Sequence, residues 1–473
     1  MRDTTVQKRK AAASDAVSDP AYQAGGGMIR ALLLFVPIVA TLAFGGVDWW
    51  MLGFLSMVTA VLAAIWLAGA AKGGEFRINT DLIQIPLIGL FGIGLIQLLP
   101  LGGGEVAAGA LSVDANSALS FDPYATRLFL VGLAVCAVFF AAALTFVDTN
   151  RRITAFAVAL LIFGPSMSFF AILQRLASAE AIYGTRPTPQ AIPFGPFVNQ
   201  HHFAALMEML SGLALGLLFG GGVTRDKKIL VAMGVVVMTV AVVFTGSRGG
   251  LISFVTVVVV AAAGSFLYRL GKPGRAGETH ANAGQIAVAV GAVAALLAVA
   301  VGTAVYLDSG AGLMRGVGAG VSGDFSTGRT HFWSIALKIF LDHPVIGAGL
   351  DAFGVAYTRY DTWNGMFRVE QAHNDYLQTL ADSGILGFAC VVGFIVLFFR
   401  RAAAGIAGSS DPLMRSIAVG AAAGCTGILI HSFFDFALRT PANGFVFLLL
   451  AVLAVNAGRV ATGEGSKRSE PPV

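Results

Sequence analysis

Charge is what this sequence has least of. Charged residues make up 12% of the 473 residues, about half of what an average soluble protein carries. Hydrophobic residues make up 56%, and the mean hydropathy is +0.78. These values exclude an ordinary soluble domain and indicate a protein that crosses a membrane many times. The net charge of +5 does not indicate nucleic-acid binding, because Lys and Arg stand singly in loops and form no basic stripe.

Cysteine and metal-ligand patterns are also scarce. Cys136, Cys390 and Cys425 lie in apolar runs without a partner at ligand spacing, so we expect neither a disulfide framework nor a metal site. The chain has no Asp-x-Asp and no outer acidic cluster with metal-ligand spacing. The Gly-rich stretch 316–328 lacks the Gly-Lys-Ser/Thr ending of a nucleotide-binding loop. We therefore expect no metal and no cofactor.

Long apolar runs dominate what is present. Runs of about 17–25 mostly apolar residues are typical of membrane-spanning helices. The sequence predicts twelve such helices, at 29–47, 49–71, 82–99, 127–147, 153–175, 202–222, 229–245, 250–268, 284–306, 384–399, 414–432 and 441–458. Residues 1–28 are polar and Gly/Ala-rich, so we expect a disordered cytoplasmic tail and not a cleaved signal peptide.

The distribution of Lys and Arg predicts the orientation. With both termini in the cytoplasm, the inner connections hold most of the 31 basic residues, as the positive-inside rule requires. The outer basic residues are Arg127, Arg175, Arg186, Arg248, Arg315, Arg329, Lys338, Arg359, Arg368 and Arg439. Nearly all of these are Arg, whose planar guanidinium suits bidentate binding of phosphate or carboxylate.

The longest segment between spans is an outer loop at 307–383. A helical pattern at 330–344 has its apolar face at Phe332, Ile335, Ala336, Ile339 and Phe340. A second helix is expected to begin near His373, with a break at Gly384 and an apolar face at Tyr376, Leu377 and Leu380. The chain thus divides into a tail (1–28), nine spans (29–306), the outer loop (307–383), three spans (384–458) and a second tail (459–473).

Polar side chains gather in five clusters, all on the predicted outer side. The clusters lie at 194–204, 244–250, 324–333, 371–387 and 431–441. Their candidate functional residues are Asn199, Arg248, Arg329, His373, Asn374, Asp375, His431 and Asp435.

Each candidate also has a simpler interpretation. Arg248 suits a side chain that snorkels at a helix end. Arg329 suits a local cap or a pair with Asp324. A lone histidine such as His373 is commonly a polar helix terminus.

The remaining polar residues suggest local structure. His431 and Asp435 are four residues apart, which favours a hydrogen-bonded pair on one helix. Asn374 and Asp375 are typical of helix-start and orienting groups. His201 and His202 begin a span, where we expect them at the membrane interface.

In this order, the clusters resemble the O-antigen ligase and O-antigen polymerase superfamily of bacterial inner-membrane glycosyltransferases. The matching features are Gly-x-Phe-x-Asn (Gly195, Phe197, Asn199), Thr-Gly-Ser-Arg-Gly (245–249), Gly-Arg followed by Trp (Gly328, Arg329, Trp333), Pro-x-x-Gly-x-Gly (Pro344, Gly347, Gly349), His-Asn-Asp-Tyr-Leu with Gly-Ile-x-Gly (His373 to Gly387) and His-x-x-x-Asp (His431, Asp435). They run over about 190–441. Many relatives have Asn-x-Asn in the first motif, where this chain has His201.

The resemblance implies a GT-C-like, all-α polytopic membrane protein with about twelve transmembrane helices and a large helical periplasmic loop between the ninth and tenth. It implies transfer of a glycan from undecaprenyl diphosphate at the periplasmic face of the inner membrane, with inversion and without metal. Arg248 and Arg329 would bind the diphosphate, and His373 would deprotonate or orient the acceptor hydroxyl. Asn199, Asn374, Asp375, His431 and Asp435 would support the site.

The acceptor stays open between lipid A core, the growing polysaccharide and a protein Ser or Thr. We favour a ligase or polymerase, because the chain ends shortly after its last span, without the outer C-terminal domain common in the protein-glycosylating branch. A transporter of lipid-linked glycan is the alternative class. It would place ionisable residues deep within spans, where Glu208 is the main candidate.

Overall fold

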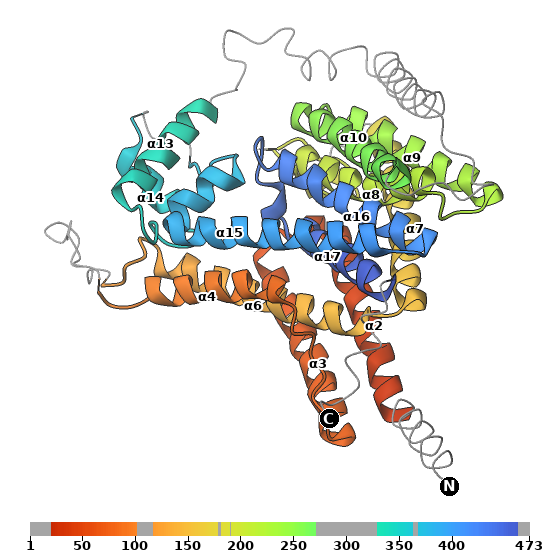
Figure 1. Ribbon diagram of the computed structural model, residues 1–473. Coiled ribbons are helices and arrows are strands. Elements are labelled where there is room, and N and C mark those ends of the chain that lie inside the picture. The colour runs from red at the N-terminus through yellow and green to blue at the C-terminus, as the bar shows by residue number, and fades with distance from the viewer. Residues whose placement is uncertain are drawn as a thin grey trace, which may run out of the picture.

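The computed structural model describes residues 20–101, 117–177, 181–189, 191–270, 329–362 and 368–461, and these are almost entirely helical (Figure 1). The α-helices are α2 (Pro20–Leu42), α3 (Trp49–Gly73), α4 (Ile85–Gln97), α6 (Pro123–Phe146), α7 (Asn150–Leu176), α8 (Gln200–Gly220), α9 (Arg225–Phe244), α10 (Arg248–Leu270), α13 (Arg329–Asp342), α14 (Phe353–Tyr360), α15 (Asp375–Gly408), α16 (Pro412–His431) and α17 (Pro441–Ala461). Three short 3₁₀ turns are η1 (Phe44–Gly46), η2 (Leu82–Gln84) and η3 (Ala437–Arg439). Strands β1 (Ala181–Ile182) and β2 (Arg186–Pro187) form a small antiparallel hairpin.

Among the described residues, ten helices are long and apolar enough to cross a membrane. This finding confirms an all-α polytopic membrane protein. The run predicted at 82–99 forms a shorter apolar helix, Leu82–Gln97. The span predicted at 284–306 lies outside the described residues, so the total of twelve stays a prediction. Helix α2 begins at Pro20, within the stretch expected to be a disordered tail.

Helices α8, α16 and α17 form the centre of the molecule. Buried residues make up 83%, 78% and 89% of their most apolar windows, well above the values for the outer helices. Helices α8 and α16 meet through Gly212 and Gly216 on one side and Gly420 and Gly424 on the other. A Cβ added to Gly216 would lie 2.3 Å from the Gly420 Cα. This small-xxx-small contact brings the two backbones together and fixes the last turn of α16 at the centre.

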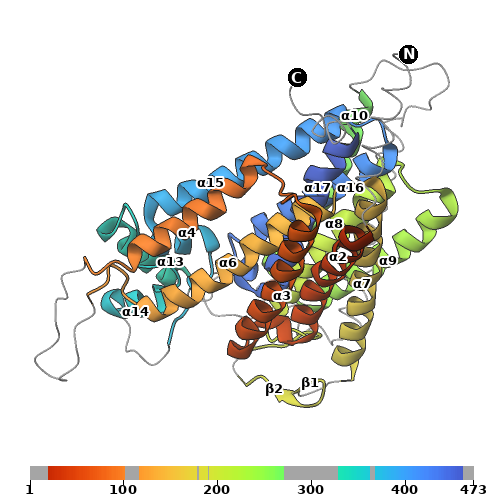
Figure 2. The same ribbon diagram turned by 90° about the horizontal axis from the view of Figure 1, so that it is seen from below.

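Ion pairs link the segments between helices in two separate sets, which mark two ends of the molecule. At one end, Asp81 pairs with both Arg401 and Arg459. At the other end, Arg186 pairs with Asp48 through two hydrogen bonds of 2.6 and 2.8 Å. The first set comes from segments predicted to be inner and the second from segments predicted to be outer, and which side faces the cytoplasm stays a prediction. We call the second the site end; it includes β1, β2, α13 and α14 (Figure 2).

The described part of the long loop is helical, as the sequence predicts. Helix α13 covers most of 330–344 and buries Ile335, Ala336 and Ile339. It packs on α14 and α15, and Figure 2 shows α13 and α14 beside one end of α15 and α4. The predicted apolar face of α13 is thus confirmed at its buried positions.

Helix α15 begins at Asp375 and continues into a membrane span, with one break in its helical geometry at Gly384 (φ 60°, ψ −164°). The predicted break is confirmed, but the predicted apolar face is wrong. Residues Tyr376, Leu377 and Leu380 are only half-buried, whereas the polar residues Asp375, Gln378 and Asp382 are buried. The first turns of α15 therefore pack on polar partners, which a pattern of hydrophobic residues does not reveal.

The Pro-x-x-Gly-x-Gly motif packs against this break. The Ile385 N–H donates to the Pro344 carbonyl, and the Ala348 N–H donates to the Ala381 carbonyl, both at 2.8 Å. The approach requires glycine at position 347, because a Cβ there would lie 2.3 Å from the Ser383 nitrogen. The motif therefore supplies partners for backbone groups that the break at Gly384 removes from the helical pattern.

Candidate active site

The connection between α16 and α17 brings the predicted clusters together. We call residues 432–440 the α16–α17 turn. The Asn374 amide donates to the Phe433 carbonyl at 3.2 Å, and the Asp375 N–H donates to the Ser432 carbonyl at 2.9 Å. The Arg329 guanidinium donates to a third carbonyl in the same turn, that of Phe434. The first residues of α13 and α15 are therefore both fixed to the turn that follows the buried helix α16.

His373 lies at the centre of this arrangement. Its Nδ1 is 3.0 Å from an Asp435 carboxylate oxygen, and 29% of its side chain is exposed. Its ring stacks on Phe332 with centroids 6.1 Å apart and meets the edge of Phe436 at 4.9 Å. The His373 backbone is left-handed, with φ 52°. For a residue other than glycine this conformation costs roughly 1–3 kcal/mol, so the contacts of His373 hold it in a strained position.

Asp435 is a buried carboxylate shared between two partners. One oxygen accepts from His373 and from the Phe436 N–H, and the other lies 3.4 Å from an Arg329 nitrogen. Burial by itself would raise the pKa of Asp435, but the hydrogen bond and charge of His373 act in the opposite direction. The result is a pKa well below the usual range, so Asp435 is ionised at neutral pH. The predicted alternative partner of Arg329, Asp324, lies outside the described residues.

Arg248 is the first residue of α10, beside the same turn. A Cβ added to the next residue, Gly249, would lie 2.8 Å from the Phe434 Cβ. Ser247 Oγ and His201 Nδ1 are 2.8 Å apart. His201, the position that departs from the family pattern, therefore contacts the segment that carries Arg248. Asn199 caps α8 by accepting from the His201 N–H at 2.8 Å.

Two histidines of the predicted clusters lie in the interior. Helix α16 ends at His431, whose Nδ1 lies 3.0 Å from a Glu208 carboxylate oxygen; each side chain is at most 1% exposed. The Asp435 N–H donates to the His431 carbonyl at 3.0 Å, but their side chains do not pair as predicted, because the chain leaves the helix and turns the Asp435 carboxylate toward His373. His202 was expected at the membrane interface but is 4% exposed, with its Nδ1 2.8 Å from the Thr440 hydroxyl.

Arg439 was not predicted as a site residue, although the sequence places it among the outer arginines. Its guanidinium meets three carboxylates, those of Asp382 at 2.9 Å, Asp351 at 3.2 Å and Asp375 at 3.4 Å. The signal available in the sequence was the seven-residue spacing of Asp375 and Asp382, which places two carboxylates on one helix face. These are the polar partners of the first turns of α15.

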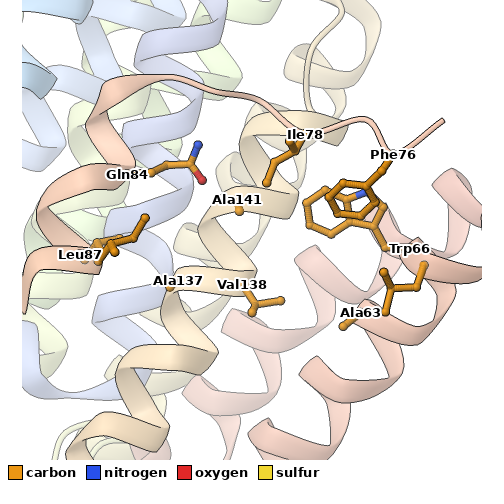
Figure 3. Close-up of a pocket in the computed structure, with 11 residues that line it drawn as sticks. Ala63, Trp66, Phe76, Ile78, Gln84, Leu87, Ala137, Val138 and Ala141 are labelled. Atoms are coloured by element: carbon orange, nitrogen blue, oxygen red, sulfur yellow. The ribbon is translucent and has the colours of Figure 1, made fainter. Parts of the chain in front are cut away.

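A cavity of about 360 Å³ lies between α3, α4 and α6, away from the site end (Figure 3). Its lining includes the stacked rings of Trp66 and Phe76, with Gln84 as a polar member. Because its lining has no ionisable side chain, it suits a hydrocarbon chain better than acid–base chemistry. Among the described residues, no group of three or more His, Cys, Asp or Glu is placed to hold a metal ion.

The fold and the site define a polytopic membrane protein with arginine, histidine and aspartate gathered at one end. Residues 233–392, from α9 to the middle of α15, match the family described as O-Antigen ligase. This match confirms the predicted resemblance to the O-antigen ligase and polymerase superfamily over that stretch. The matched stretch contains Arg248, Arg329 and His373, while Asn199 and Asp435 lie outside it. No curated protein matches the chain.

Proposed function

We propose that this protein is an O-antigen ligase-like glycosyltransferase. It moves a glycan from undecaprenyl diphosphate to an acceptor hydroxyl at the periplasmic face of the bacterial inner membrane, with inversion and without metal. The family match supports the class of enzyme. The observation that carries the mechanism is the single arrangement of His373, Asp435 and Arg329.

His373 is the proposed base. Asp435 is ionised and can only accept at its carboxylate, so the His373 Nδ1 must carry the donated hydrogen. The neutral imidazole then has its basic lone pair on Nε2. That nitrogen takes the proton of the acceptor hydroxyl while the hydroxyl oxygen attacks the anomeric carbon. Asp435 orients the ring and stabilises the imidazolium that forms.

Arg329 and Arg248 are the proposed diphosphate ligands. As the new glycosidic bond forms, the bond from the anomeric carbon to the phosphate oxygen breaks, and its electron pair leaves with the diphosphate. Guanidinium groups stabilise this charge through forked, charge-assisted hydrogen bonds. Arg329 is 24% exposed beside His373, and Arg248 is half-buried at the start of α10. Two fixed cations thus provide the neutralisation that a metal ion provides in other phosphate chemistry.

The other candidates have supporting roles. Asn374 caps α15 by accepting from the N–H groups of Tyr376 and Leu377, and Asn199 caps α8. Asp375 fixes α15 to the α16–α17 turn by accepting from the Ser432 hydroxyl at 2.9 Å.

Glu208, the residue on which the transporter alternative depends, is buried against His431 at the centre of the molecule. That contact gives Glu208 a structural partner, whereas the exposed part of His373 gives the site end a group that can reach an acceptor. The balance favours a transferase. A polymerase of the same superfamily uses the same chemistry with the growing polysaccharide as acceptor.

The surface-glycan profile of a deletion strain tests the function. Intact lipid A core without polymer indicates a ligase, and core carrying a single repeat indicates a polymerase. Unchanged lipopolysaccharide with loss of another polymer indicates an exopolysaccharide enzyme. In each case the wild-type gene should restore the profile and the His373→Ala gene should not, with lipid-linked donor accumulating in the outer leaflet. Accumulation in the inner leaflet would contradict a transferase and indicate a transporter.

A further inference from the structure

We propose that Arg439 is a positioning residue for His373. Its half-buried guanidinium holds α15 and the loop before it in the geometry that presents the imidazole to the acceptor. The proposal rests on the proposed role of His373 as base.

The contacts of Arg439 join three separate parts of the site end. Its Nη2 meets Asp382 and its Nε meets Asp375. These two residues lie about two helical turns apart on α15. Its Nη1 meets Asp351, which lies in the loop between the Pro-x-x-Gly-x-Gly motif and α14. Arg439 itself lies in η3, within the α16–α17 turn. One side chain therefore connects α15, the loop that packs on its break, and the turn that carries Asp435.

The same contacts lie beside two strained backbone positions. The non-glycine residues with positive φ in the described part of the chain are Phe44, Tyr183, Asp351 and His373. Asp351 (φ 60°) is paired directly with Arg439. His373 (φ 52°) lies two residues before Asp375, whose side chain meets Arg439 and whose N–H is fixed to Ser432. Strained conformations persist only where surrounding contacts over-determine them; Arg439 supplies such a contact to Asp351 directly and to His373 through Asp375.

Charge shows that Arg439 acts through its protein partners and not on the diphosphate. Each of its three nitrogen groups meets a carboxylate, and 18% of its side chain is exposed. One guanidinium faces three carboxyl groups, and when these are ionised the cluster has an excess of negative charge, which would repel a diphosphate. Arg439 holds carboxylates that would otherwise repel one another, and a variant without this cation should let the start of α15 move.

The test compares turnover per folded molecule in purified, bilayer-reconstituted Arg439→Gln and Arg439→Lys. We expect kcat to fall about 10- to 100-fold in Arg439→Gln, because misplacement by about 1 Å can cost 100-fold, with donor Kd within twofold of wild type. Arg439→Lys should recover only part of kcat, since a point charge cannot meet three carboxylates in a fixed fork. Wild-type kcat in folded Arg439→Gln would overturn the proposal.

The matched control is Arg186→Gln, which removes another half-buried arginine with a bidentate partner, Asp48, at the same end. It should lower thermal stability and leave kcat per folded molecule unchanged. An equal loss of kcat in this control would contradict a specific role for Arg439. If Arg439→Gln does not fold, Asp382→Asn is the alternative variant. It weakens the contact between Arg439 and Asp382 and removes one negative charge from the cluster. A folded Asp382→Asn protein with unchanged kcat would then reject the proposal.

His373→Ala, assayed in parallel, separates the two ideas. If His373→Ala retains transfer, the proposed function of His373 fails. If His373→Ala is inactive while Arg439→Gln turns over normally, the base stands and only the positioning role fails.

Discussion

Two arginine–aspartate clusters lie a few residues apart in the α16–α17 turn, and their charge balance is opposite. At the first, a single buried carboxylate, Asp435, serves both Arg329 and His373. At the second, a single half-buried guanidinium, Arg439, serves Asp351, Asp375 and Asp382. The first cluster has donors in excess around one carboxylate, while the second has acceptors in excess around one guanidinium.

The difference shows how one type of ion pair performs two tasks. A partly exposed site with an excess of hydrogen-bond donors can still bind an anion. In its described contacts, Arg329 meets only one carboxylate, that of Asp435. An excess of acceptors around one cation binds the cation firmly and gives the surrounding backbone a fixed geometry. We therefore assign chemistry to the first cluster and positioning to the second.

The largest effect should come from His373→Ala, which removes the proposed base of the first cluster. Transfer should fall by at least about 100-fold, the lower range for general-base catalysis. The measurement is glycan transfer by purified protein from lipid-linked donor to acceptor in bilayers. His343→Ala provides the control, since His343 lies at the site end but packs on Phe121 and outside the first cluster. Comparable transfer by the two variants would remove His373 from the mechanism.

The next effect should come from Arg329→Ala, which removes the cationic donor of the same cluster. Loss of a charge-assisted hydrogen bond costs about 1.5–3 kcal/mol, or roughly 10- to 100-fold in donor affinity. Arg329→Lys should restore only part of this affinity, because a point charge cannot fork to two oxygens. The control is Arg368→Ala, whose side chain is 84% exposed. Full rescue by Lys, or equal weakening in the control, would show that only bulk charge matters.

Asp435→Asn should lower kcat by about 10-fold or more, because the orienting carboxylate and its charge are lost. It should also change the pH dependence of stability. The folded-state pKa of Asp435 is held well below its usual value of about 4, chiefly by His373 against the effect of burial. Its contribution to stability is therefore present above about pH 4 and is lost as the pH falls through the folded-state pKa. Thermal unfolding of both proteins should converge only at acidic pH; a difference that vanishes already at pH 6 would contradict an ionised Asp435.

The smallest effect should come from Asp351→Asn in the second cluster. Burial raises the pKa of Asp351 despite the opposing charge of Arg439, so the folded protein disfavours its ionised form at neutral pH. Asparagine also adopts the left-handed backbone of this position readily. Tm should be unchanged or slightly higher than wild type at pH 8, and this advantage should shrink as the pH falls and Asp351 takes up its proton. A large loss of Tm at pH 8 would mean that the second cluster needs all three charges.

The sequence was informative about the fold for a simple physical reason. Apolar runs and the break at Gly384 are local properties; ten of the predicted spans and the break appear among the described residues. The partners of Asp435 and Arg439 were not predictable in the same way. They come from segments up to about a hundred residues away, and the buried polar face of α15 reverses the usual rule that apolar residues face inward. The prediction failed where a polar network replaced hydrophobic packing.

The central claim is that, within the first cluster, His373 performs the chemistry and Arg329 binds the anionic donor. Donor affinity tests this claim most directly. The measurement is equilibrium binding of the lipid-linked donor to wild-type, His373→Ala and Arg329→Ala proteins in the same bilayers. We expect His373→Ala to bind like wild type while failing to transfer, and Arg329→Ala to bind about 10-fold more weakly or worse. Equal loss of affinity in both variants, or none in Arg329→Ala, would contradict the division of roles between base and diphosphate ligand.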